Sequence, residues 1–242
     1  MRLITGCNEP YLPRMLDYLK TLDSKADFPI TLVTVGFEWD SSFKKVETVS
    51  LPTKLNKGAP YETEAIQHGS FLKVVKPRPR EVLLCTDGDF FMQRPMDDSE
   101  KEMLNLKKGQ VVTSWNGGPD ETLGVEAGRL HPKMPIGRIS DDWGLLDKPI
   151  YNAGFLAATT ETWKDIYNEY MMRWERVGSF FGHMARQQWL ISYVIASQGL
   201  DVTVAPWSFH AHGHFGPKPG MTRGGDGLIY ADGKLACFRH YL

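Results

Sequence analysis

Short apolar runs alternate with segments of helical periodicity along most of the chain, and this alternation constrains the fold more than any other feature. Strand-like runs occupy residues 3–7, 30–35, 46–51, 82–85, 110–115, 153–158 and 202–204. Helical patterns occupy residues 12–22, 62–75, 160–174 and 184–198. Such alternation is typical of a mostly parallel sheet covered by helices on both faces. We therefore expect an α/β protein.

Two regions depart from this alternation. Residues 116–149 are rich in Gly, Pro and Asp and have no clear period, and residues 205–227 are irregular and glycine-rich. Residues 228–238 are typical of a hairpin with Asp232-Gly233 as its turn. The sequence contains no repeat, low-complexity tract or linker, so residues 1–242 are expected to form a single domain with an irregular C-terminal segment and a hairpin.

Composition excludes several classes of protein. The 242 residues carry a formal net charge of −1 and no run of five like charges, so no nucleic-acid partner is expected. No stretch approaches the roughly 20 apolar residues of a membrane span, so no transmembrane segment is expected. Cys7, Cys85 and Cys237 fit no zinc or redox spacing, which favours a reducing compartment and a cytoplasmic protein.

The apolar run Val82–Cys85 ends in Asp87-Gly88-Asp89. In open α/β sheets, ligands bind at the carboxyl ends of the strands. Two carboxylates on alternate residues of an extended segment can point the same way, and their oxygens suit Mg²⁺ or Mn²⁺. The alternative is a simple acidic turn after a strand. A calcium-binding EF-loop would need further oxygen ligands at set offsets, which Phe90, Phe91 and Met92 do not supply.

A second cluster lies near the C-terminus, where His210, His212 and His214 alternate and Lys218 follows. In an extended segment all three imidazoles can face one side, and imidazole can complete a metal site that already has carboxylates. Lys218 can reach a phosphate. A polar surface loop and a zinc site made of histidines alone are the alternatives.

Two further segments carry polar side chains suited to binding a sugar. Asn152 and Gly154 open the small-residue strand, so Asn152 can bond a hydroxyl while Gly154 permits close approach; a plain strand entry is the alternative. Gln187 and Gln188 open the apolar helix 184–198, and a sugar would satisfy their amides. The alternative is that both glutamines lie in an exposed first turn.

Taken together in this order, the segments resemble one family. Asp87-Gly88-Asp89 resembles the DxD motif of GT-A glycosyltransferases. Asn152-Ala-Gly-Phe resembles a segment of the glycogenin-like and lipopolysaccharide galactosyltransferase-like group (family 8). His212 with Lys218-Pro219 resembles that group's C-terminal His-x-x-Gly-x-x-Lys-Pro motif. The resemblance spans roughly residues 2–220 and implies a GT-A, Rossmann-like sheet.

The resemblance implies a role for each matching residue. Asp87, Asp89 and His212 would bind the metal, usually Mn²⁺ (or Mg²⁺). Three residues would lie near the donor nucleotide or face it, and Lys218 would contact its diphosphate. Asn152 and Gln188 would line the pocket for the donor sugar and the acceptor. The three donor-facing residues are Asn8, Tyr11 and Lys73.

The chain departs from the family pattern at three places. The glycine expected three residues after His212 is Phe215, with glycine one residue later, which makes His214 a rival metal ligand. Gln187 stands where the family often has Asp, and Gly220 replaces the tryptophan expected after Lys-Pro. The missing carboxylate at residue 187 leaves the sugar contact open.

The resemblance implies a metal-dependent glycosyltransferase that moves a sugar from a nucleotide-diphosphate donor, with a UDP-sugar favoured, to a hydroxyl of a glycan, lipid or protein acceptor. Retention at the anomeric carbon is expected; if the enzyme inverts, Asp141, Asp142 and Asp147 are candidate bases. One alternative is a sugar nucleotidyltransferase, which would carry a basic glycine-rich loop where residues 6–10 stand. The other is a catalytically degenerate sugar-nucleotide or glycan-binding module.

Overall fold

The computed structural model describes residues 1–55, 69–130, 143–177, 185–213 and 220–240. Their central element is a seven-stranded sheet of order β3-β2-β1-β4-β7-β6-β8. All its neighbouring strands are parallel except β7, which runs antiparallel to both β4 and β6. This mixed but mostly parallel sheet confirms the predicted α/β class. The bounds are β1 Arg2–Asn8, β2 Ile30–Val35, β3 Val46–Leu51, β4 Val82–Thr86, β6 Gln110–Trp115, β7 Tyr151–Thr159 and β8 Asp201–Val204.

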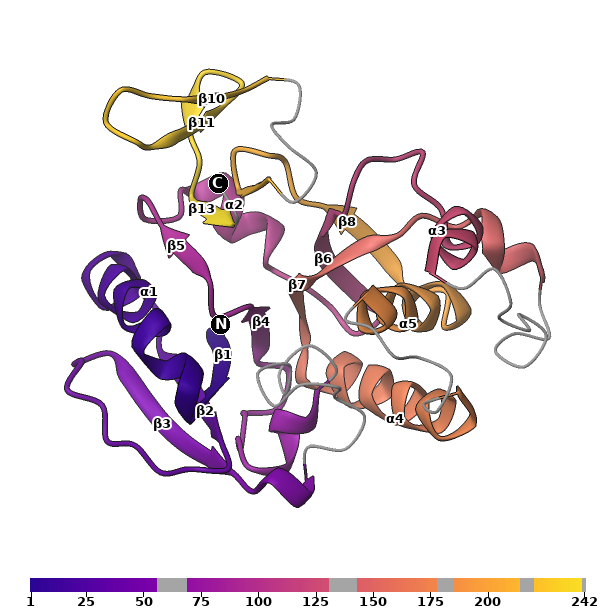
Figure 1. The fold of residues 1–242 in the computed structure, drawn as a ribbon, viewed down its shortest axis with the longest axis horizontal. Coiled ribbons are helices and arrows are strands. Elements are labelled where there is room, and N and C mark those ends of the chain that lie inside the picture. The colour runs from indigo at the N-terminus through magenta and orange to yellow at the C-terminus, as the bar shows by residue number, and fades with distance from the viewer. Residues whose placement is uncertain (56–68, 131–142, 178–184, 214–219, 241–242) are drawn as a thin grey trace.

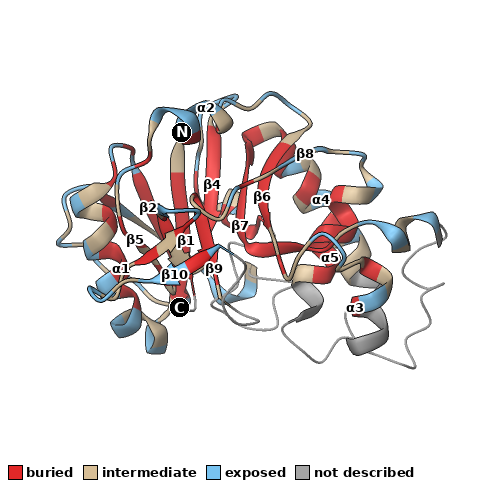
Figure 2. Cartoon of the chain, turned by 90° about the horizontal axis from the view of Figure 1, so that it is seen from above, coloured by how far each residue is buried: buried red, intermediate tan, exposed pale blue. Residues whose placement is uncertain are grey.

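Helices cover the sheet on both faces, as Figures 1 and 2 show. Alternate residues of a strand point to opposite faces, so Leu84 packs in the cluster with α1, and Leu83 packs in the cluster with α4 and α5. The inner strands β2, β1, β4, β7 and β6 are buried along most of their length, whereas the edge strands β3 and β8 are partly exposed. The α-helices are α1 Leu12–Lys25, α2 Asp98–Met103, α3 Leu123–Leu130, α4 Thr160–Val177 and α5 Ala185–Ser197.

Two small sheets are built mainly from the C-terminal part of the chain. One has the order β10-β11-β12, with bounds Met221–Arg223, Ile229–Ala231 and Lys234–Leu235. Its β11–β12 hairpin turns at Asp232 and Gly233, both at positive φ, as predicted. The other has the order β5-β13-β9, with bounds Phe90–Met92, Phe238–His240 and His210–His212. The second sheet therefore ties the segment after the acidic pair to the end of the chain.

Short 3₁₀ helices join several elements, and one of them corrects a prediction. They are η1 Glu9–Tyr11, η2 Thr53–Leu55, η4 Ser70–Lys73 and η6 Trp143–Asp147. The helix predicted over 62–75 is wrong in its described part, because Gly69 has a left-handed φ of +93° and only η4 follows it. Residues 62–68 lie outside the described residues. The Asn8 side chain caps η1, which leads directly into α1.

Two regions expected to be irregular contain regular structure. Within 116–149, the described residues include α3 and η6, and the indole N–H of Trp189 donates a 2.8 Å hydrogen bond to the Leu123 carbonyl at the start of α3. Within 205–227 they include β9 and β10. These elements are stabilised by contacts with distant parts of the chain, which local periodicity does not reveal. Among the described helices none is long and apolar enough to cross a membrane.

Trp163 on α4 anchors this helix to the sheet. Its side chain is fully buried, its indole N–H donates a 3.0 Å hydrogen bond to the Leu83 carbonyl of β4, and its ring meets Phe71 edge-on at 5.4 Å between centroids. Replacing Trp163 with Ala is expected to lower the free energy of unfolding by about 3–5 kcal/mol. Guanidinium denaturation followed by circular dichroism measures this.

Met172→Ala on the same helix is the matched control, because Met172 is 41% exposed. Its effect should stay within about 0.5 kcal/mol. An unchanged denaturation midpoint for Trp163→Ala would contradict this account of how α4 is held.

Candidate functional site

The acidic pair lies in the short turn that joins β4 to β5. Asp87 follows the last residue of β4 directly, and its backbone N–H donates a 3.1 Å hydrogen bond to the Gly154 carbonyl of β7. Asp89 immediately precedes β5. The two carboxylates are 18% and 26% exposed, so they are accessible at the edge of a buried sheet. The structure thus places both at the carboxyl end of β4, where the sequence predicted them.

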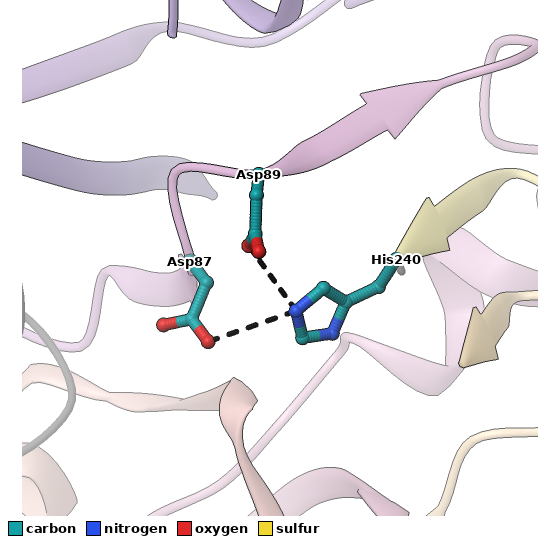
Figure 3. Close-up of side chains that lie close together, drawn as sticks. All are labelled: Asp87, Asp89 and His240. Carbon is teal, nitrogen blue, oxygen red and sulfur yellow. Dashed lines mark ion pairs between the residues drawn. The ribbon is translucent and has the colours of Figure 1, made fainter. Parts of the chain in front are cut away.

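His240 completes this group. In the small sheet, β13 runs antiparallel to β5 with His240 opposite Phe90, so its side chain lies next to Asp89. His240 Nε2 is 3.1 Å from Asp89 Oδ1 and 3.9 Å from Asp87 Oδ2, and the side chain is 1% exposed (Figure 3). One ligand atom from each of the three residues lies within 4.8 Å of the others. Two carboxylate oxygens and an imidazole nitrogen are a donor set that fits Mn²⁺ or Mg²⁺.

His212, the histidine predicted as third ligand, lies on the neighbouring strand. Strands β9 and β13 are parallel, His212 is opposite His240, and the two ring centroids are 4.9 Å apart. His212 is buried, and its assignment as a metal ligand stays a prediction. His214 and Lys218 lie outside the described residues. The alternation of Phe238 and His240 at the end of the hairpin was the one sequence signal for His240.

Buried aromatic rings pack against His210 and His240. The ring of Phe90 stacks on His240 at 4.2 Å and on His210 at 4.8 Å between centroids. His210 also stacks on Phe155, and its Nδ1 lies 2.7 Å from Ser114 Oγ. Burial, followed by the nearby His240 and His212, holds the pKa of His210 well below its ordinary value, so this ring is neutral at pH 7. His210 is therefore part of the packing that orients His240.

The end of β1 brings Asn8 and Tyr11 to the same sheet edge. Asn8 Oδ1 accepts a 3.2 Å hydrogen bond from the Tyr11 N–H, which fixes the turn into η1. Burial and the charges of Asp89 and Asp87 raise the pKa of Tyr11 to about 12, so its phenol lies within electrostatic reach of both carboxylates. A β-carbon on Gly88 would lie 3.2 Å from Tyr11 Cε1 and 2.9 Å from Met15 Sδ, so this segment packs closely against the acidic turn.

The Asn152–Gly154 segment closes the other side of the acidic pair. Asn152 Oδ1 accepts a 2.9 Å hydrogen bond from the Gly154 N–H, and a β-carbon on Gly154 would overlap Asp87 Oδ2. Only glycine at residue 154 therefore leaves Asp87 its position. On α5, Ser192 Oγ accepts a 2.9 Å hydrogen bond from the Tyr151 N–H and lies 2.7 Å from the Gln188 carbonyl oxygen, which ties the first turns of this helix to the same strand.

Lys73, which the family resemblance implies would face the donor, contacts the Leu55 carbonyl and the Tyr167 ring in the structure. Its ammonium donates a 3.2 Å hydrogen bond to the Leu55 carbonyl and lies 5.5 Å from the centroid of the Tyr167 ring. Asp147 belongs to η6, and Asp141 and Asp142 lie outside the described residues. The structure thus brings together Asp87, Asp89, His240, Tyr11 and the Asn152 segment.

Comparison with known proteins supports the fold. No protein-family model and no curated protein matches the chain. Solved structures do match: the galactosyltransferase LgtC in complex with donor and acceptor sugar analogs, and an active-site glutamine-to-glutamate mutant of LgtC. In both cases the TM-score is 0.61 at 11% sequence identity, over 100% of this chain and 87% of the other. The chain therefore has the GT-A fold that the sequence predicted.

The contact between Gly154 and Asp87 leads to a test of the metal group. Gly154→Ala is expected to displace the Asp87 carboxylate and to weaken Mn²⁺ binding at least about tenfold. Electron paramagnetic resonance of free Mn²⁺ during titration measures the affinity.

Gly118→Ala is the control, because a β-carbon at Gly118 meets no atom within 4 Å. If Gly154→Ala, still folded by circular dichroism, binds Mn²⁺ as tightly as the wild type, Asp87 is not a ligand in the arrangement described.

Proposed function

We propose that this protein is a metal-dependent glycosyltransferase that uses a nucleotide-diphosphate sugar, with a UDP-sugar as the favoured donor. One observation carries the proposal: Asp87, Asp89 and His240 converge at the carboxyl end of β4, beside the end of β1. This is the edge of an open α/β sheet at which ligands bind. The common fold with a galactosyltransferase supports it.

In this proposal the chain holds the donor at its nucleotide and at its diphosphate. Asn8 and Tyr11, at the end of β1, contact the nucleotide. Asp87, Asp89 and His240 hold a divalent cation, Mn²⁺ or Mg²⁺. His212, opposite His240 on the neighbouring strand, supplies a further imidazole. Such a cation supplies positive charge that stabilises the departing diphosphate. Lys218, from the segment that follows β9, provides a second positive charge for the same oxygens.

The donor sugar is proposed to lie over the Asn152–Gly154 segment. Asn152 offers an amide to a sugar hydroxyl, and the missing side chain of Gly154 leaves room beside Asp87. Gln188 on α5 is proposed to line the side on which the acceptor hydroxyl enters. Transfer with retention follows from the resemblance to family 8. The acceptor is a glycan, lipid or protein hydroxyl.

The proposal is tested by the Asp87→Ala, Asp89→Ala double variant. Without the two carboxylates, neither the cation nor the diphosphate is held, and turnover should fall at least about a hundredfold. The measurement is Mn²⁺-dependent release of UDP from a panel of UDP-sugars, with water or simple glycosides as acceptors.

Asp17→Ala, Asp120→Ala is the matched control, since both of these carboxylates are exposed and neither belongs to the acidic turn. Equal rates for wild type and the Asp87, Asp89 double variant would refute the metal role. A wild-type protein that binds UDP-sugar in calorimetry but transfers to no acceptor would favour the binding module instead.

A further inference from the structure

A pocket with polar and charged side chains in its wall lies on the opposite face of the β5–β13 pair from the acidic group. Alternate residues of a strand face opposite sides, so Phe90 and His240 face the carboxylates while Phe91 and Arg239 face away. The pocket on that far side has a volume of about 310 Å³. Its walls come from the end of α1, from β5 and β13, and from the loop that follows β10. Its residues are distinct from those of the proposed donor site.

Three cationic side chains line this pocket: Lys25, Arg223 and Arg239. The Cζ atom of the Arg239 guanidinium lies over the Phe91 ring, 4.5 Å from its centroid, and Nη1 donates a 3.4 Å hydrogen bond to the Gly227 carbonyl. The ammonium of Lys25 donates a 3.0 Å hydrogen bond to the Met92 carbonyl. Arg239 and Lys25 are therefore held in place before any ligand arrives, which reduces the entropy cost of binding.

The guanidinium of Arg223 lines the same pocket as that of Arg239, close enough for the two positive charges to interact. Burial, followed by the charge of Arg223, lowers the pKa of Arg239 below its ordinary value. Within the described part of the chain no carboxylate forms an ion pair with Arg223 or Arg239. Two neighbouring like charges without an anion between them cost free energy. A bound anion would remove that cost.

The acidic residue in the pocket wall is already engaged. Asp226 accepts hydrogen bonds from the Leu228 N–H at 3.0 Å and from the Tyr230 hydroxyl at 3.3 Å. It fixes the loop after β10 and forms no ion pair with the cations that line the pocket. The lining therefore carries a surplus of positive charge.

We propose that Lys25, Arg223 and Arg239 form a binding site for a phosphate group, separate from the donor site. Guanidinium groups bind the oxygens of phosphate in paired, charge-assisted hydrogen bonds, and an ammonium adds a point charge. Three positive charges around one opening match a phosphate dianion better than a single carboxylate. The group can be carried by a soluble phosphorylated molecule or by a phospholipid headgroup, because both present negatively charged phosphoryl oxygens.

Calorimetric titration with inorganic phosphate tests the site. The buffer contains EDTA at constant ionic strength, so that no divalent cation can hold phosphate at Asp87 and Asp89. Wild type should show saturable binding with a stoichiometry of one. Arg223→Gln should weaken it at least about tenfold, and Arg223→Lys should weaken it less because the charge remains. Arg223 is exposed, so these variants should keep the fold.

Arg78→Gln is the matched control, because Arg78 is exposed and lies in the loop before β4, outside the pocket. Its phosphate affinity should equal that of the wild type. Non-saturable binding to the wild type, or equal affinity of Arg223→Gln and wild type, overturns the proposal. Neither result depends on glycosyl transfer, so the proposed function can fail while this site stands, and the reverse.

Vesicle sedimentation identifies the carrier of the phosphate group. Wild type and Arg223→Gln are mixed with vesicles of phosphatidylglycerol, and with phosphatidylcholine vesicles as a neutral control. Binding to phosphatidylglycerol that Arg223→Gln loses assigns the site to lipid headgroups. Saturable binding of inorganic phosphate without vesicle binding assigns it to a soluble ligand. Vesicle binding that Arg223→Gln retains in full, together with phosphate binding that it retains, contradicts the site.

Discussion

The pairing of β13 with β5 is the interaction on which the candidate site depends. It places His240 opposite Phe90 and beside Asp89, with Nε2 3.1 Å from a carboxylate oxygen. Without this pairing, Asp87 and Asp89 would be an acidic turn at the end of a strand. With it, three ligand atoms of types that suit a hard divalent cation lie within 4.8 Å of one another. The last described residues of the chain thus complete a group that begins in its first half.

The central sheet supplies the rest of the geometry. Because β1 and β4 are parallel neighbours, their carboxyl ends bring Asn8, Tyr11 and Asp87 to one edge. Because β7 runs antiparallel beside β4, its first residues, including Asn152 and Gly154, arrive at that same edge. The acidic pair at the end of β4 therefore lies between the end of β1 and the start of β7. The galactosyltransferase LgtC shares this fold, although only 11% of residues are identical.

The sequence predicted the features that depend on local residue patterns, namely the strands of the central sheet and the acidic turn. β-Branched and apolar runs located all seven strands of the central sheet, and the charge after Val82–Cys85 located the acidic pair, because strand burial and turn chemistry are read over a few residues. His240 could not be predicted in the same way, since its partner strand β5 lies far back in the sequence. Helix α3 was not predicted for a similar reason, because its start is held by a hydrogen bond from Trp189 of the distant helix α5. The helix predicted over 62–75 failed at Gly69, where the backbone is left-handed.

A crystal structure of the protein with Mn²⁺ and UDP tests the central claim most directly. Anomalous scattering would locate the metal. Our account predicts one Mn²⁺ bound by Asp87, Asp89 and His240, with the diphosphate on the metal and the uridine beside Asn8 and Tyr11. It would also show whether His212 contacts the metal. A metal bound without His240, or a diphosphate bound away from the acidic pair, would contradict the account.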